Sequence, residues 1–510
     1  MTGQSTIVDL LQVGDDDDVA LSGLDRPALR YSELRTQVTR TVAELNDLGI
    51  GRNDRVAIVL PNGPEMATAF ISIASGATTA PLNPAYKKDE FDFYLSDLNA
   101  KALLVEAGSE SPAIEAARAH DIQVLDLCVA ENAPAGAFSL HPREPNNEKP
   151  AVNGGLAQSD DIALVLHTSG TTSRPKIVPL THGNVCTSAR NIQKTLQLDA
   201  TDVCLNIMPL FHIHGLMAAV LATLGTGGAV FAAPGFDALK FFSWLDKANP
   251  TWYTAVPTMH QAILGRAKRN QSSIDQARLR FIRSSSSSLP SQVLLELEKT
   301  FGVRVVEAYA MTEAAHQMTC NQLPPGLRKP GTVGCAAGPE VRIMDESNPT
   351  LLGKGDTGEI VIRGNNVTAG YENNPKANTE CFVDGWFRTG DQGILDDDGY
   401  LTITGRLKEI INRGGEKISP REIDDVLMDH EAVQQVVTFA MPHKSLGEEV
   451  AAAVVLYEGC EADEKSIRSF AGERLASFKV PRKILFLDEI PKGATGKLQR
   501  IGLAEKLGLG

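Results

Sequence analysis

The sequence predicts an α/β fold with a large N-terminal domain of parallel α/β layers, a β-rich subdomain and a small C-terminal α+β domain. Three observations support it. Short apolar segments of strand length alternate with helical patterns over residues 31–306. From about Gly331 the pattern changes to short strands and glycine turns. After Arg406 a second mixed unit begins, so we expect domains at residues 1–406 and 407–510.

The first elements alternate between helix and strand. Apolar residues recur at helical spacing over residues 31–48, and two glycines then end the helix. The next expected elements are a strand over 55–60, helices over 64–75 and 89–98, a strand over 102–105, a linker over 132–160 and a strand over 161–166. Such alternation implies parallel strands joined by helices.

The alternation resumes after residue 181. Helices are expected over 184–196, 216–224, 236–248, from 257 and over 290–301, and strands over 203–207, 229–231, 252–255, 279–283 and 303–306. The β-rich region would contain strands over 341–344, 358–363 and 400–404. The small domain would contain helices over 420–430 and 464–475 and strands over 433–440, 450–456 and 483–487.

Length, charge and cysteine spacing exclude several classes of protein. A chain of 510 residues is too long for one compact core. The net charge of -14 argues against a nucleic-acid or anionic-membrane binder. The seven cysteines are scattered without a CxxC pair, which favours reduced thiols and no structural metal. No secretory signal, membrane span or Ser-Lys-Leu ending is evident, so we expect a cytoplasmic protein.

One stretch carries the clearest chemical signal, residues 167–176 with the sequence HTSGTTSRPK. It lies between a predicted strand and a second apolar segment, and it holds five hydroxyl residues, one glycine and two cations. Such a loop can wrap phosphate oxygens with backbone N–H groups, hydroxyls and charge. It is not a Walker A loop, because Pro175 stands where the second glycine would be. A solvated Ser/Thr turn is the alternative interpretation.

The segment TSGTTSRPK resembles the phosphate-binding signature of the adenylate-forming acyl-CoA synthetase family. Four further segments of that family follow in order: YAMTE at 309–313, RTGD at 388–391, GRLK at 405–408 and PKGATGKLQR at 491–500. The resemblance covers nearly the whole chain. It implies that ATP, with Mg²⁺, activates a carboxylic acid as an acyl-adenylate, that coenzyme A then accepts the acyl group, and that the small domain is a mobile lid.

The resemblance also implies a set of ATP-binding residues. The β- and γ-phosphates would be held by Thr168, Ser169, Gly170, Thr171, Thr172 and Lys176. Tyr309 would stack on adenine, and the edge of the base would be contacted by Ser286, Glu307 and Ala308. Asp391 would accept hydrogen bonds from both ribose hydroxyls, with Arg406 beside it at the ribose and phosphate.

Four residues are implied as catalytic: Lys497, Thr312, Glu313 and His212. Because the reaction brings two anions together, positioning and charge neutralisation must supply most of the catalysis. Glu313 would bind Mg²⁺, and Thr312 would also contact ATP. Lys497, also part of the ATP site, would span the acid's carboxylate and the α-phosphate.

The family resemblance places a hinge at Lys408. After pyrophosphate leaves, the small domain would swing about this residue and present the segment 412–417 to the site. Gly414 and Gly415 would let the pantetheine of coenzyme A approach closely, although paired glycines also form ordinary turns. Asn412 stands where several family members carry a lysine, so its role in the thioester step is open.

The expected acyl pocket is polar and short. Five serines at 284–288 follow Arg283, where many family members have a small Gly-Ala-Ala run. A long apolar tail would leave these groups unpaired, whereas a small second carboxylate would satisfy them. We predict that this distal carboxylate is bound by His214, Ser285 and His316. His212 and His214 share a face only if the segment is extended, and each histidine could instead be an ordinary polar residue.

Four phrases resemble the oxalate:CoA ligase branch of the family: RFIRSSSSSL, WYTAVPTMHQ, EAYAMTEAAHQM and INRGGEKISP. This resemblance implies conversion of oxalate, ATP and CoA to oxalyl-CoA, AMP and pyrophosphate. A CoA ligase for another short, medium-chain or aromatic acid is the alternative, and it would favour apolar residues at 284–288. A non-catalytic nucleotide- or RNA-binding protein would be expected to have lost Glu313 or Lys497.

Overall fold

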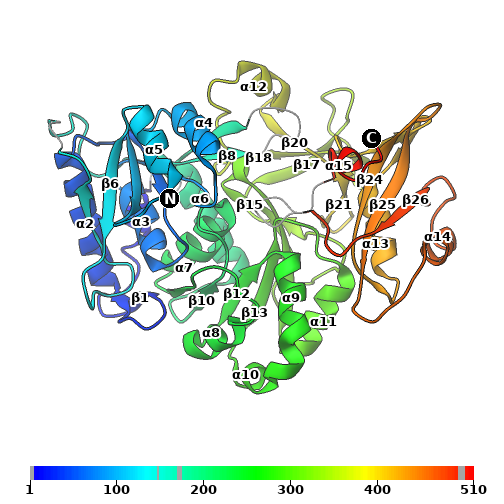
Figure 1. Cartoon of the computed structure of the whole chain (residues 1–510), viewed down its shortest axis with the longest axis horizontal. Helices are drawn as coiled ribbons and strands as arrows, with labels where there is room; N and C mark the ends of the chain where they lie inside the picture. The colour runs from blue at the N-terminus through cyan, green and yellow to red at the C-terminus, as the bar shows by residue number, and fades with distance from the viewer. Residues whose placement is uncertain (1–4, 146–148, 169–174, 492–499) are drawn as a thin grey trace.

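The computed structural model of the chain describes residues 5–145, 149–168, 175–491 and 500–510. These residues form four β-sheets, three in the N-terminal part and one in the C-terminal part (Figure 1). The expected α/β class, with a large N-terminal and a small C-terminal unit, is confirmed.

The first large sheet has seven strands in the described residues, and its inner strands run parallel. In spatial order they are β7 (Ser139–Pro142), β6 (Gln123–Cys128), β5 (Ala102–Glu106), β3 (Arg55–Val59), β4 (Thr78–Pro81), β8 (Ile162–Thr168) and β9 (Lys176–Thr181). Four helices belong to this part of the chain: α2 (Tyr31–Asp47), α3 (Pro64–Ala74), α4 (Lys88–Leu98) and α5 (Pro112–Ala119). The edge strands β7 and β9 are antiparallel to their neighbours.

The second large sheet has nine strands in the described part of the chain. They are, in spatial order, β16 (Cys335–Ala336), β15 (His316–Cys320), β14 (Arg304–Met311), β13 (Phe281–Ser285), β12 (Trp252–Ala255), β10 (Val203–Asn206), β11 (Ala229–Ala232), β1 (Val19–Ser22) and β2 (Leu29–Arg30). Strands β12, β13 and β14 are parallel neighbours, so their carboxyl ends meet at one edge of the sheet.

The helices of this second part include one π-helical segment, η1 (His214–Leu221), where the sequence predicts an α-helix from residue 216. The others are α1 (Ile7–Leu10), α6 (His182–Leu196), α7 (Ala222–Leu224), α8 (Phe241–Ala248), α9 (Pro257–Ala267), α10 (Gln271–Gln276) and α11 (Ser291–Phe301), with short 3₁₀ turns η2 (Lys268–Asn270) and η3 (Thr312–Ala314). Every residue of η1 is buried, which explains its apolar sequence after His214.

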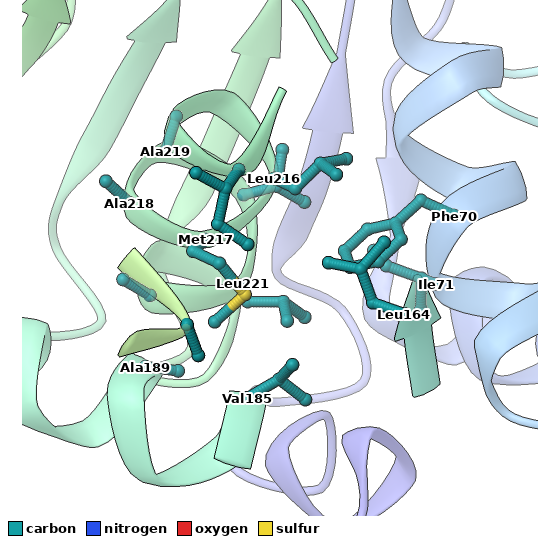
Figure 2. Packing of buried hydrophobic residues seen from close by; sticks show 14 of the residues in the cluster. Phe70, Ile71, Leu164, Val185, Ala189, Leu216, Met217, Ala218, Ala219 and Leu221 are labelled. Carbon is teal, nitrogen blue, oxygen red and sulfur yellow. The ribbon is translucent and has the colours of Figure 1, made fainter. Parts of the chain in front are cut away.

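One hydrophobic core joins the two large sheets. In Figure 2 the side chains of Phe70 and Ile71 from α3 lie beside Leu164 of β8, and Leu216 and Leu221 of η1 lie near them. Figure 2 also shows Val185 and Ala189 of α6 on the side of Met217, and Ala218 and Ala219 of η1 belong to the same core. The packing fixes η1, and therefore His214 at its first turn, between the two layers.

The β-rich region forms a five-stranded antiparallel sheet in the described residues. Its elements are β17 (Glu340–Met344), β18 (Thr357–Arg363), α12 (Pro375–Cys381), β19 (Phe382–Val383), β20 (Trp386–Leu395) and β21 (Leu401–Arg406). The proposed domain boundary after Arg406 coincides with the end of β21.

The C-terminal part is a separate five-stranded sheet with three helices among the residues described. Its elements are β22 (Ile411–Arg413), β23 (Glu416–Ile418), α13 (Pro420–Met428), β24 (Val433–His443), β25 (Gly447–Leu456), α14 (Glu464–Gly472), β26 (Lys483–Phe486) and α15 (Leu503–Lys506). These orange and red elements lie to one side of the N-terminal part in Figure 1. A hydrogen bond of 2.9 Å from Gln292 Nε2 to Asp429 Oδ1 and an ion pair of 2.6 Å between Lys417 and Glu346 join the two parts.

Some expected boundaries are wrong for local reasons. The helix expected from residue 236 begins at Phe241, because the Asp237 carboxylate accepts hydrogen bonds from the backbone N–H groups of Leu239 and Lys240 and forms a turn. The expected linker at 132–160 contains the edge strand β7. None of the described helices combines the length and apolar composition that a membrane span requires.

Candidate active site

The phosphate-binding stretch begins and ends on a β-hairpin. Strands β8 and β9 are antiparallel, and Thr168 at the end of β8 is paired with Lys176 at the start of β9. The segment between them, with Ser169, Gly170, Thr171 and Thr172, lies outside the described residues. The hairpin therefore places Thr168 and Lys176, the two described residues among those predicted to bind phosphate, directly opposite each other.

Glu313 lies buried in the 3₁₀ turn η3, after the half-buried Thr312. Its carboxylate Oε1 accepts a hydrogen bond of 2.7 Å from the hydroxyl of Tyr371. The Lys176 ammonium lies 4.3 Å from the centre of the same tyrosine ring. Tyr371 thus connects the predicted metal-binding carboxylate to the predicted phosphate-binding cation.

Burial and the neighbouring groups act in opposite directions on the pKa of the Glu313 carboxyl. Burial raises the pKa of the Glu313 carboxyl, while the Tyr371 hydrogen bond and the positive charges of Lys176 and Arg406 oppose that rise. Within the described ranges, no group of three or more His, Cys, Asp or Glu side chains is arranged to hold a metal ion. A single carboxylate suits Mg²⁺, which in nucleotide sites takes one or two carboxylates together with phosphate oxygens and water.

A second cluster joins two sheets through Asp391 of β20. Its carboxylate accepts a hydrogen bond from the Tyr309 hydroxyl of β14 and forms a 3.0 Å ion pair with Arg406 Nε. Burial is the main cause that raises the pKa of Tyr309, so this hydroxyl stays a donor. The structure thus brings together three of the residues that the resemblance assigns to adenine and ribose.

The edge of the predicted adenine site is held by hydrogen bonds that join β14 to β13 and to the loop after it. Ser285 Oγ donates to the carbonyl oxygen of Ala308 at 2.9 Å. The fully buried Glu307 carboxylate accepts from the backbone N–H of Leu289, also at 2.9 Å. Ser286 lies between these contacts with a φ of 73°, a left-handed conformation that turns the chain out of the strand.

Glu307→Gln is expected to weaken the pH dependence of stability. Burial raises the pKa of Glu307 from 4.5 to about 7, so between these values the folded protein holds a proton that the unfolded chain has lost. This group therefore makes stability fall as the pH rises through that window. Gln keeps an oxygen that can accept from Leu289 but does not ionise. We expect the substitution to increase the free energy of unfolding by up to about 3 kcal/mol at pH 8 and by little at pH 4. Urea unfolding of both proteins at the two pH values measures this difference. Equal pH dependence of the two proteins would contradict this.

The predicted acyl-binding histidines are brought together. The rings of His214 and His316 stack at 4.9 Å with an interplanar angle of 26°. His214 Nδ1 lies 3.0 Å from Ser286 Oγ, and its Nε2 lies 2.6 Å from Thr254 Oγ1. The predicted partner Ser285 is buried nearby in β13, where its hydroxyl is bonded to the backbone of β14.

His212 lies in the turn before η1, where its Nδ1 accepts a hydrogen bond of 3.2 Å from the backbone N–H of His214. The segment is a turn and not an extended strand, which is the alternative in which the sequence predicts that the two side chains are separated. His214 is fully buried, whereas His212 is half-buried. Its catalytic role stays a prediction.

A fully buried arginine completes this cluster. Arg283 Nη1 lies 3.3 Å from His214 Nε2, and Nη2 lies 3.2 Å from His316 Nε2 and 3.3 Å from Gln317 Oε1. No carboxylate pairs with Arg283 among the residues that the structure describes, and its Nε has no hydrogen-bond partner there. Burial lowers the pKa of this guanidinium to about 10, which still leaves it charged at neutral pH.

Four residues that contact the predicted site residues were not identified from the sequence: Tyr371, Arg283, Thr254 and Gln317. Arg283 belongs to the serine-rich phrase, and a charge inside a predicted buried strand was the available signal. Tyr371 lies outside every segment that carries the resemblance, so the sequence offered no comparable signal for it.

The remaining predicted residues belong to the C-terminal part or its boundary. Lys408 lies between β21 and β22, and its role as a hinge stays a prediction. Lys497 lies outside the described residues. Gly414 and Gly415 form the two-residue turn of the β22–β23 hairpin, with φ angles of 59° and 98°. A turn with two positive φ angles favours glycine by itself, so contact of these glycines with CoA stays a prediction.

Comparison with known proteins adds family and structural matches. Residues 13–372 match the model described as "AMP-binding enzyme", and residues 422–497 match "AMP-binding enzyme C-terminal domain". The oxalate–CoA ligase of Arabidopsis thaliana is 45% identical over 487 residues, covering 94% of both chains. The oxalate–CoA ligase of Saccharomyces cerevisiae is 44% identical over 476 residues, covering 89% of this chain and 87% of that protein. ATP-bound MatB from Rhodopseudomonas palustris superimposes with a TM-score of 0.87 at 28% identity, over 98% of this chain and 99% of that chain.

Proposed function

Because the chain belongs to the family of AMP-binding enzymes, we propose that it is an ATP-dependent ligase that joins oxalate to coenzyme A. In the first step, a carboxylate oxygen of oxalate attacks the α-phosphorus of ATP, and pyrophosphate leaves. In the second step, the CoA sulfur attacks the acyl carbon of the oxalyl-adenylate, and AMP leaves. The products are oxalyl-CoA, AMP and pyrophosphate. Relatives at 44–45% identity that act on oxalate support this choice of acid.

The observation that carries the proposal is the buried guanidinium of Arg283. A buried charge is stable only when it is paired, and the neighbours of Arg283 are the polar but uncharged partners Thr254 and Gln317 together with two histidines. The distal carboxylate of a dicarboxylic acid would supply the missing negative charge. A fatty or aromatic tail would instead leave the guanidinium unpaired, at a considerable cost in binding.

The nucleotide side of the site supports the same chemistry. Asp391, held by Tyr309 and Arg406, would accept the ribose hydroxyls, while Thr168 and Lys176 would contact the phosphates. Glu313 would hold Mg²⁺, which supplies charge neutralisation on phosphate oxygens when bound. Lys497 would neutralise charge at the α-phosphate during the first step and be withdrawn by rotation about Lys408 for the second.

We place this activity in the cytoplasm, because the seven cysteines are free thiols in the described structure and suit a reducing compartment. The substrates are a small dicarboxylate, ATP and CoA.

The direct test is CoA-dependent AMP release with ATP and Mg²⁺ over a panel of acids: oxalate, malonate, acetate, hexanoate and coumarate. We expect strong turnover with oxalate alone. Malonate serves as the matched control for chain length, because it differs from oxalate by one methylene. Preference for hexanoate or coumarate would leave the ligase class intact and would contradict the polar acyl pocket.

A further inference from the structure

Tyr371 lies between two oppositely charged groups of the nucleotide site, and the proposed reaction gives it no role. Its side chain is buried, with the residue 6% exposed. One end of the ring donates a 2.7 Å hydrogen bond to Glu313 Oε1, and the ring centre is 4.3 Å from Lys176 Nζ. Lys176 is near enough to act electrostatically on Glu313, and Tyr371 contacts both groups.

The backbone around Tyr371 is fixed to both neighbours. The N–H of Thr368 donates to the carbonyl oxygen of Glu313 at 2.7 Å, and the N–H of Glu372 donates to the carbonyl oxygen of Ile177 in β9 at 3.1 Å. The Asn378 side chain bonds to both the N–H and the carbonyl oxygen of Tyr371, at 2.7 and 2.8 Å. The ring is therefore held in place by contacts that do not depend on a bound ligand.

An aromatic ring is a suitable separator for these two charges. A cation above a ring face is attracted by the ring's quadrupole but keeps its full charge for a phosphate, unlike a cation paired with a carboxylate. A carboxylate has about four lone-pair sites, so one hydrogen bond from the tyrosine leaves capacity for a metal ion. A direct ion pair would satisfy both groups and weaken their attraction for ATP and Mg²⁺.

We propose that Tyr371 is a positioning residue that keeps Lys176 and Glu313 apart and orients both, so that each is available when Mg²⁺ and ATP bind. The proposal deepens the proposed function and rests on its assignment of these two residues. The ring and the hydroxyl have separable tasks. The ring prevents the ion pair and seats the lysine, whereas the hydroxyl orients the carboxylate.

Two variants of the full-length protein separate these tasks. Tyr371→Phe keeps the ring and removes the hydroxyl, whereas Tyr371→Leu removes both. The matched control is Tyr400→Phe, because Lys329 Nζ lies 4.4 Å from the Tyr400 ring centre and the Tyr400 hydroxyl donates to the Leu327 carbonyl oxygen at 2.7 Å. Tyr400 therefore also combines a lysine over its ring with a donated hydroxyl hydrogen bond, on residues that have no assigned part in the reaction, although Lys329 is in addition paired with Asp396 and Asp398.

The measurement is titration calorimetry with ATP, once in EDTA and once in MgCl₂, without acid or CoA. Tyr371→Phe should bind metal-free ATP within about twofold of the natural protein and Mg²⁺·ATP about tenfold more weakly. Tyr371→Leu should weaken both by about tenfold, and Tyr400→Phe should change neither. Melting temperatures check that each variant is folded. If Tyr371→Leu does not fold, the binding of Tyr371→Phe decides the test.

The proposal is overturned if Tyr371→Phe binds Mg²⁺·ATP as the natural protein does, or if it loses metal-free ATP to the same extent. The binding measurements contain no acid, so they do not depend on which acid the enzyme prefers. A preference for an acid other than oxalate would contradict the proposed substrate and leave these binding ratios unchanged. If the natural protein itself does not bind ATP, both the proposed function and the proposed role of Tyr371 are wrong.

Discussion

Replacing Arg283 by methionine should lower kcat/KM for oxalate about a thousandfold. Loss of one partner from a buried, hydrogen-bonded charge pair costs about 2–5 kcal/mol. Methionine is unbranched and apolar, so it fills much of the space without supplying charge or donors. The effect is measured by steady-state AMP release at varied oxalate and saturating ATP and CoA. The KM for ATP should stay nearly constant, because Arg283 contacts the acyl cluster rather than the Asp391 and Glu313 clusters.

Arg283→Lys is the matched control for charge. It keeps a cation but loses the planar fork that reaches His214 and His316 together, so it should recover only part of the activity. Residual turnover of acetate, which has no distal carboxylate, separates substrate binding from folding. An equal loss with oxalate and acetate, or a fall in melting temperature of matching size, would show that Arg283 is structural.

Lys497→Ala should abolish adenylation while sparing the thioester step. The predicted task of this lysine is to neutralise charge between two anions, and removal of such a group costs about 10²–10³-fold in rate or more. Formation of oxalyl-adenylate is measured by oxalate-dependent pyrophosphate release. Formation of oxalyl-CoA is then measured from supplied oxalyl-adenylate and CoA, where the variant should match the natural protein.

Lys506→Ala provides the control for this experiment, because Lys506 is an exposed lysine of α15 in the same C-terminal unit. It should leave both steps unchanged. Equal loss of adenylation and thioester formation in Lys497→Ala would contradict the division of labour between the two positions of the small domain.

The sequence predicted the layered fold well where periodicity and turn residues agree. The strand at 252–255 was placed at its observed bounds, and the change to short strands after Gly331 matches the β-rich sheet. The meeting of Tyr309 with Asp391, which are far apart in the chain, followed from the family resemblance. No local pattern in the sequence predicts that contact between Tyr309 and Asp391.

The acyl and phosphate clusters show what tertiary packing adds. A histidine before an apolar run does not reveal that a π-helix begins there, so the orientation of His214 depends on packing between two sheets. An arginine in a strand is ordinarily expected to face water, and only the tertiary structure, which places His214 and His316 beside the guanidinium, shows that Arg283 is a buried cation. Tyr371 is placed by hydrogen bonds to β9 and η3, which no local pattern encodes.

The distribution of the clusters over the sheets has a consequence for how such an enzyme can diverge. Most of the acyl cluster comes from one sheet, since Thr254, Arg283 and His316 are on strands β12, β13 and β15 of the nine-stranded sheet, and His214 is at the start of η1. The nucleotide groups Lys176, Glu313 and Asp391 come from elements of three different sheets. Substitutions within one sheet can therefore change which acid a descendant enzyme activates. Its use of ATP, in contrast, depends on the unchanged packing of all three sheets.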